Sequence, residues 1–294
     1  MIRAAAFLIL LSVSAAADPA VAVNGVLLED VSVLTRGAAP GEIILIAVGK
    51  APGGAPTGTL GGRPLDFYKV AGGGYAALAA FDLDVATGPV RLDLVLDGPQ
   101  GPHASSRAIM VRHKAFPTTH LTVDDRFVRL SPADQARVER EQARTKAIYA
   151  AGGRVPLYRG RFVSPIPGAT AARFGERRVF NGVPKDPHNG ADLRAAEGDP
   201  VRAPAAGRVV LAADLFYSGG TVILDHGLGL FSIYAHLSRI DAVENRSLRE
   251  GEILGLVGKT GRATGPHLHW GVKLMGSRAD PFSMTALPLE DYLP

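Results

Sequence analysis

Histidine and carboxylate side chains are concentrated between His188 and Val272, where five of the eight histidines of this 294-residue chain lie. Four of these histidines fall in three short motifs, which are HNGAD (188–192), YAHL (234–237) and GPHLHW (265–270). A histidine and a carboxylate four residues apart, joined by a later histidine, can supply the three protein ligands of a catalytic zinc ion and leave a fourth position for water. The motifs therefore predict a zinc site.

The spacing within the motifs indicates how these side chains are presented. His267 and His269 are separated by one residue, and residues i and i+2 of a β-strand project from the same face, so both imidazoles can reach one metal pocket. Leu268 then points to the opposite face, into a core. In the first motif, Asn189-Gly190 disfavours a helix, so we expect a turn that enters a strand. The helical zinc motif HExxH occurs nowhere in the chain.

The chain resembles peptidase family M23, the LytM/lysostaphin-type zinc endopeptidases that cut peptide bonds in bacterial peptidoglycan. The resemblance extends from about residue 160 to 283 and rests on an ordered set of motifs: Asn181-Gly182, HNGAD, the run 198–209, Asp225-His226-Gly227, YAHLS and TGRATGPHLHWGV. It implies that His188, Asp192 and His269 bind one Zn²⁺ ion per chain. It also implies that His236 and His267 are catalytic histidines that do not bind the metal.

The implied chemistry is peptide hydrolysis by zinc-activated water. One neutral histidine can take a proton from the water, and a second can hydrogen-bond to the carbonyl oxygen or protonate the leaving amine; which of His236 and His267 does which stays open. Asn181 is predicted either to contact substrate or to form a turn. Tyr234 precedes His236 by two residues in a predicted strand, so it is predicted to share its face, as a substrate contact or as packing. His226 is expected in a hairpin turn, outside the site.

The beginning of the chain reads as a secretory signal peptide at residues 1–17. It combines Arg3, an apolar run at residues 4–13 and the small residues 14–17. We therefore expect export, to the periplasm, and no membrane-spanning segment, because the apolar run is too short to span a bilayer. Cysteine is absent, so metal ligands must come from histidine and carboxylate.

The formal net charge is +4, and no basic stripe with interleaved aromatic residues occurs, so nucleic acid is not an expected partner. The modest positive charge suits an anionic cell wall, and peptidoglycan is the expected partner.

We predict a mainly β fold. Short strands such as Ile43 to Val48 and Val90 to Leu96, the latter with alternating polarity, are separated by glycine and proline turns and predict a small β-sandwich at residues 18–115. A connector follows at 116–158, with a helix at 131–150 that begins at the Ser131-Pro132 cap and carries charge pairs. Residues 159–294 are predicted to form an antiparallel β-sheet metallopeptidase domain of the LytM/lysostaphin type.

The resulting hypothesis is a secreted zinc metallo-endopeptidase that hydrolyses peptide cross-links or stem peptides of peptidoglycan during cell-wall remodelling. The alternative is a non-catalytic M23-like module that binds and activates another wall hydrolase. Retention of the metal ligands distinguishes the enzyme from the non-catalytic module. All three ligands are present, together with His236 and His267.

Overall fold

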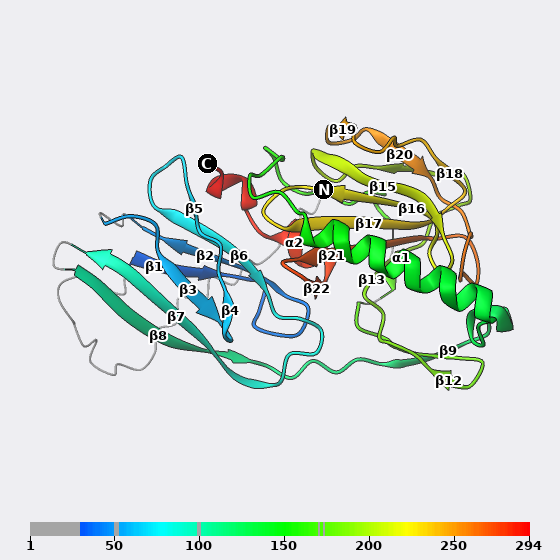
Figure 1. The fold of residues 1–294 in the computed structure, drawn as a ribbon, viewed down its shortest axis with the longest axis horizontal. Coiled ribbons are helices and arrows are strands. Elements are labelled where there is room, and N and C mark those ends of the chain that lie inside the picture. The colour runs from blue at the N-terminus through cyan, green and yellow to red at the C-terminus, as the bar shows by residue number, and fades with distance from the viewer. Residues whose placement is uncertain (1–29, 50–52, 99–100, 170, 173) are drawn as a thin grey trace, which may run out of the picture. The chain divides into compact units, whose positions relative to one another are not determined.

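The computed structural model describes residues 30–49, 53–98, 101–169, 171–172 and 174–294 (Figure 1). The expected signal peptide at residues 1–17 and the first part of a strand expected from Gly25 to Val33 lie outside these ranges. The chain divides into two compact units, one of Met1–Lys114 with Phe282–Pro294 and one of Ala115–Pro281. We call them unit 1 and unit 2.

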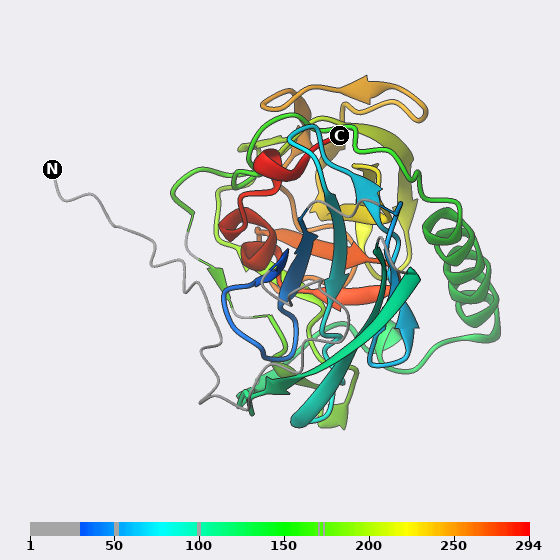
Figure 2. The ribbon, with the colours of Figure 1, turned by 90° about the vertical axis from the view of Figure 1, so that its left-hand side faces the viewer.

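Unit 1 is built from two four-stranded antiparallel sheets, with the strand orders β1-β2-β6-β5 and β4-β3-β7-β8 (Figure 2). The strands are β1 (Val31–Leu34), β2 (Ile43–Val48), β3 (Thr57–Leu60), β4 (Arg63–Pro64), β5 (Tyr68–Lys69), β6 (Tyr75–Ala80), β7 (Gly88–Gly98) and β8 (Gly101–Val111). Leu92, Leu94 and Leu96 are buried, alternate along β7 with the less buried Asp93 and Val95, and pack in one core with Ile44 and Ile46 of β2. The predicted small β-sandwich is confirmed.

The end of the chain also belongs to unit 1. It contains α2 (Pro281–Ala286) and the 3-10 helix η3 (Leu289–Tyr292). The backbone N–H of Ile43 donates to the hydroxyl of Ser283 at 2.7 Å, and that of Ala71 donates to the carbonyl of Leu293 at 2.9 Å. The units therefore divide the chain differently from the expected domains, which placed all of residues 159–294 together and residues 116–158 in a separate connector.

Unit 2 contains an eight-stranded antiparallel sheet in the order β10-β13-β21-β17-β16-β15-β19, with β22 beside β21. The strands are β10 (Ala171–Ala172), β13 (Gly190–Leu193), β15 (Gly207–Leu215), β16 (Gly219–Asp225), β17 (Leu230–Leu237), β19 (Ser247–Leu248), β21 (Leu268–Leu274) and β22 (Ser277–Ala279). Every residue of β16 is buried, as expected for a central strand covered on both faces. The predicted antiparallel sheet is confirmed.

Two three-stranded sheets complete unit 2, in the orders β12-β11-β9 and β14-β20-β18. Their strands are β9 (Thr118–Leu121), β11 (Arg177–Phe180), β12 (Val183–Pro184), β14 (Pro200–Arg202), β18 (Arg239–Ile240) and β20 (Ile253–Leu256). β9 pairs with β11 in parallel, which the sequence did not predict. A short 3-10 helix, η2 (Asp125–Phe127), follows β9.

Helix α1 (Pro132–Ala150) lies in unit 2 and begins as predicted, with Ser131 at its N-cap accepting a hydrogen bond from the backbone N–H of Asp134. Its apolar side chains Ile148 and Tyr149 pack on a cluster of sheet residues that includes Ile223. No described helix has the length and hydropathy needed to cross a bilayer.

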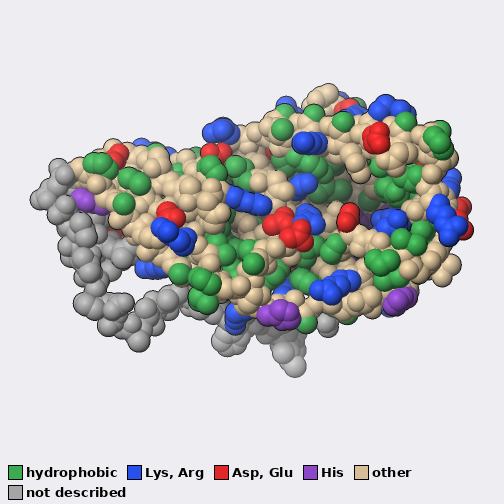
Figure 3. Space-filling model, turned by 60° about the horizontal axis from the view of Figure 1, so that its bottom comes forward, with side chains coloured by type: hydrophobic (Ala, Val, Ile, Leu, Met, Phe, Trp, Pro, Cys, Tyr) green, Lys and Arg blue, Asp and Glu red, His purple; other side chains and the backbone are tan. Residues whose placement is uncertain are grey.

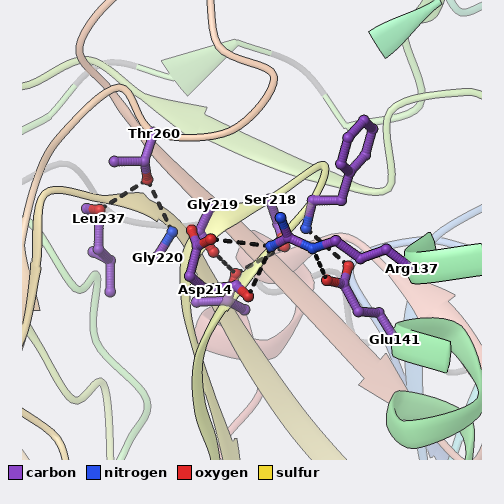
Figure 4. A network of polar contacts seen from close by, with 10 residues as sticks. Arg137, Glu141, Asp214, Ser218, Gly219, Gly220, Leu237 and Thr260 are labelled. Carbon is purple, nitrogen blue, oxygen red and sulfur yellow. Dashed lines mark hydrogen bonds and ion pairs between the residues drawn. The ribbon is translucent and has the colours of Figure 1, made fainter. Parts of the chain in front are cut away.

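Polar contacts fasten α1 to the hairpin between β15 and β16 (Figure 4). Arg137 pairs with Glu141 one turn later at 2.7 Å, which confirms the expected charge pair, and reaches the carboxylate of Asp214 at 3.0 Å. Glu141 accepts a hydrogen bond from the backbone N–H of Phe216 at 2.8 Å. The helix is thereby held beside the face of the sheet that carries the site.

Candidate metal centre and catalytic site

Three neighbouring strands place the centre of the site. Asp192 on β13 lies directly opposite His269 on β21, which lies opposite Ala235 on β17. Directly paired residues of antiparallel strands share a face, so the carboxylate and the imidazole stand side by side. The flanking residues Leu268 and Trp270 are fully buried on the other face, as predicted for Leu268.

The donor atoms of His188, Asp192 and His269 converge. His188 Nε2 and His269 Nδ1 are 2.9 Å apart, and each lies 2.9 Å from Asp192 Oδ1. A triangle with these sides has a circumradius of about 1.7 Å, shorter than a zinc–nitrogen bond of about 2.0–2.1 Å, so one ion can touch all three atoms. Within the described residues, no other group of histidine, cysteine and acidic side chains meets the same requirement.

Gly190 in the HNGAD motif makes this convergence possible. A β-carbon at this position would lie 2.7 Å from Cε1 of His269 and 2.6 Å from the carbonyl oxygen of Trp270. Both distances are shorter than van der Waals contact, so any larger residue would displace the ligand imidazole or separate β13 from β21. The glycine is required by close approach of a neighbouring strand.

The second oxygen of Asp192 is held by Arg178 of β11, whose Nη2 donates to Oδ2. Although burial alone would raise the pKa of Asp192, the hydrogen bonds from His188 and His269 keep it far below its usual range. Asp192 is therefore an anion with one oxygen directed at the two histidines and the other oriented by Arg178. The sequence motifs did not identify Arg178, which lies in a short strand outside them.

His236 and His267 stand beside this group with their ring centroids 4.8 Å apart. The Nδ1 of His236 lies 2.8 Å from the carbonyl oxygen of Thr260, and that of His267 lies 2.8 Å from the carbonyl oxygen of Gly265. A carbonyl only accepts, so each Nδ1 carries a hydrogen, and in a neutral ring the lone pair is then on Nε2. Burial, followed by the charges of His269 and His267, lowers the pKa of His236 to about 3, which keeps its ring neutral near pH 7.

A β-bulge turns His236 toward the site. Tyr234 of β17 pairs with Val222 of β16, and Leu237 pairs with Gly220. Two residues of β17 therefore lie opposite one residue of β16 between these pairs, which is a β-bulge. His236 has a φ of 65°, in the left-handed region. Side chains do not alternate between the two faces of the sheet at this bulge, so Tyr234 and His236 do not share a face.

Tyr234 therefore packs in the interior, which is one of the two alternatives predicted for it. Its side chain is fully buried, opposite Trp270, and its hydroxyl lies 2.6 Å from the hydroxyl of Ser232. Asn181 forms the turn between β11 and β12, and its amide binds the backbone of Val123 and the carboxylate of Asp125, which gives it the turn role.

His226 lies between β16 and β17, in the predicted position, and is fully buried. Its ring nitrogens contact the Ala206 carbonyl and the Ser232 hydroxyl, so it takes no part in the group of ligand histidines.

Two hollows meet at the site. The helix-side hollow, of about 350 Å³, is lined by residues of α1 together with His188, His236 and His269. The loop-side hollow, of about 320 Å³, is lined by β11, Asp192 and the loop 262–267. Figure 3 shows a hollowed region in the right-hand part of the molecule, with basic side chains beside apolar ones. Together the hollows form a groove on both sides of the candidate metal centre.

The candidate metal ligands and both candidate catalytic histidines lie within the region that matches a known family. The family model described as Peptidase family M23 matches residues 186–281. A crystal structure described as a peptidase M23 from Pseudomonas aeruginosa is 31% identical, with a TM-score of 0.64, and the match covers 85% of this chain and 95% of that one.

Two curated relatives match a shorter segment. The DD-carboxypeptidase/endopeptidase Mpg of Neisseria meningitidis serogroup B is 42% identical over 101 residues, which cover 34% of this chain and 23% of the relative. The peptidoglycan DD-endopeptidase ShyA of Vibrio cholerae is 39% identical over 90 residues, which cover 31% of this chain and 21% of the relative. The matched segment thus spans less than a quarter of either curated relative.

Proposed function

The chain belongs to peptidase family M23, and we propose that it is an exported zinc metallo-endopeptidase that hydrolyses peptide cross-links or stem peptides of peptidoglycan. The observation that carries this proposal is the convergence of His188 Nε2, Asp192 Oδ1 and His269 Nδ1 within 2.9 Å of one another, at the floor of a groove. The name of the curated relative ShyA, a peptidoglycan DD-endopeptidase, supports a peptidoglycan substrate, and the name of Mpg, a DD-carboxypeptidase/endopeptidase, supports endopeptidase activity.

Two histidines and one carboxylate are a donor set that suits zinc in a catalytic site, where three protein ligands leave a position open. Bound there, zinc would polarise the scissile carbonyl and lower the pKa of water. The orientation of Asp192 by Arg178 fixes which carboxylate oxygen faces the metal position.

His236 and His267 supply the proton transfers. In each ring the Nδ1–H is held by a backbone carbonyl, so the neutral tautomer has its lone pair on Nε2. One of these nitrogens accepts a proton from the attacking water and, as an imidazolium, can donate it to the leaving amine or hydrogen-bond to the developing oxyanion. The low pKa of His236 keeps it in the accepting form before the reaction.

The groove supports an extended substrate. It continues on both sides of the metal ligands, from the α1 residues Glu141 and Thr145 to the loop residues Thr264 and Gly265. An endopeptidase needs such space on both sides of the scissile bond, whereas a pocket closed on one side would suit removal of a terminal residue.

The test is digestion of purified, cross-linked peptidoglycan by the zinc-loaded protein, with the released fragments identified by mass. We expect wild type to produce new amine and carboxyl ends and His188→Ala to produce none. His113→Ala, which changes an exposed histidine of unit 1, is the matched control and should retain activity.

If wild type binds zinc and peptidoglycan but releases no fragment, the enzyme proposal is wrong and the non-catalytic module that activates another hydrolase takes its place. Cleavage of an unrelated protein in preference to peptidoglycan would instead contradict the proposed substrate.

A further inference from the structure

Arg262 is an arginine at the site that forms no ion pair with any described residue. Its guanidinium stacks between two aromatic rings, 4.4 Å from the ring centre of Phe180 and 4.6 Å from that of Tyr217. Its backbone N–H donates to the Tyr217 carbonyl at 2.7 Å, which fixes the loop that carries it. Among the described residues, the guanidinium makes neither a hydrogen bond nor an ion pair. The side chain is therefore rigid, and its planar set of donors is available to a ligand.

The position of Arg262 relates it to the substrate groove. Arg178 and Arg262 are the two described residues that line both the helix-side and the loop-side hollows. The boundary between the hollows is also where the candidate metal ligands lie, since His188 and His269 line one and Asp192 lines the other. A peptide that runs through both hollows passes Arg262 close to its scissile bond.

The charges of the two arginines are not equivalent. Arg178 is neutralised by Asp192, with which it forms an ion pair. Arg262 has no such partner, and burial, together with the positive charge of Arg178, lowers its pKa, while Tyr217 and Asp186 oppose this effect. A partly desolvated cation without an ion-pair partner gains free energy when an anion binds.

We propose that Arg262 binds a free carboxylate on the residue that contributes the leaving amine of the substrate. This assignment rests on the proposed function. Two kinds of leaving residue carry such a carboxylate on the carbon that bears the amine. One is a residue at the end of a peptide chain, and the other is a diamino diacid whose second amine forms a cross-link. The guanidinium pairs with the carboxylate through two parallel N–H···O bonds and orients the scissile bond over the metal ligands.

The test uses four synthetic peptides. Two carry the leaving residue as a chain terminus, with its carboxylate free or converted to a carboxamide, and two carry it within a cross-link in the same two forms. kcat and KM are measured for wild type, Arg262→Gln and Arg262→Lys. Arg249→Gln is the matched control, because its side chain is 90% exposed and lies in the same unit.

We expect wild type to prefer the carboxylate over the carboxamide by a factor on the order of 10 to 100 in kcat/KM, the usual range for a charged hydrogen bond. Arg262→Gln should reduce this ratio to near one, mainly through KM, and Arg262→Lys should retain part of it. The pair of peptides that shows this preference, chain-terminus or cross-linked, identifies which kind of residue supplies the carboxylate. Arg249→Gln should behave as wild type.

The proposal is overturned if wild type cleaves both forms equally, or if Arg262→Gln loses activity on both forms by the same factor, as a purely structural stacking role would require. Failure of wild type to cleave any of the four peptides or purified peptidoglycan would instead reject the proposed function, and the subsite with it. Fluorescence of Trp270, the single tryptophan of the chain and fully buried in unit 2, verifies that each variant is folded.

Discussion

Replacement of the buried His226 by glutamine is predicted to change how the stability of unit 2 depends on pH. The Nδ1 of His226 lies 2.8 Å from the Ala206 carbonyl, which only accepts, so this nitrogen carries the hydrogen. Nε2 then accepts from the hydroxyl of Ser232 at 2.7 Å, and Ser232 in turn accepts from the hydroxyl of Tyr234. The ring is fully buried in its neutral form.

The expected effect follows from the pKa of His226, which burial lowers from 6.5 to about 4. Between these values the unfolded chain binds more protons than the folded one, so stability is present above pH 6.5 and is lost as the pH falls toward 4. Each pKa unit corresponds to about 1.4 kcal/mol, which gives a total of about 3 kcal/mol, of which about 2 kcal/mol is lost between pH 7.5 and pH 5.

The assay is urea unfolding at pH 7.5 and pH 5, followed by the fluorescence of Trp270. His226→Gln should be less stable than wild type at pH 7.5 by about 1–3 kcal/mol, because hydrogen bonds are lost. The difference should shrink by about 2 kcal/mol at pH 5, since the variant has no imidazole to protonate. The exposed His120 provides a control variant, His120→Gln, with the wild-type dependence. An equal difference at both pH values would refute the reasoning.

Three further predictions concern the geometry of the site. Gly190→Ala should weaken zinc binding at least about 10-fold in a chelator-competition assay, because the added β-carbon meets the His269 ring. The control is Gly72→Ala, which should leave zinc binding unchanged because a β-carbon there meets nothing within 4 Å. Arg178→Gln should lower zinc affinity by about 10- to 100-fold through the loss of its bond to Asp192, and an unchanged affinity would contradict its positioning role. Thr260→Val should lower the free energy of unfolding, measured in urea, by about 1–3 kcal/mol. The Thr260 hydroxyl that it removes donates to the Leu237 carbonyl at 2.8 Å and accepts from the Gly220 N–H at 2.9 Å (Figure 4). Thr260→Ser keeps the hydroxyl and should stay near the wild-type value.

The elements that could be predicted from the sequence are those with a local signal. The strand at Ile43–Val48 lies where its continuous apolar run predicts it, and the helix at Pro132–Ala150 begins at the predicted Ser131 cap. The histidine motifs identified side chains that the fold brings together. The close spacing of His267 and His269 on either side of a buried Leu268 follows directly from strand geometry.

The features that could not be predicted depend on contacts between distant segments. Alternation alone placed Tyr234 on the same face as His236, but the bulge in β17 depends on its pairing with β16 and on Thr260, which lies on a separate loop. Arg178 is a site residue only because β11 is positioned beside β13, and its short strand carries no motif. The last residues of the chain join unit 1 through Ser283, which no local pattern indicates.

The measurement that most directly tests the central claim is a crystal structure of the zinc-loaded protein, with anomalous scattering collected at the zinc absorption edge. We expect one peak in unit 2, within about 2.0–2.2 Å of His188 Nε2, Asp192 Oδ1 and His269 Nδ1, with His236 and His267 outside bonding distance. A peak bound by His236 or His267 in place of one of these ligands, or a zinc-loaded crystal with no peak at this position, would contradict the account.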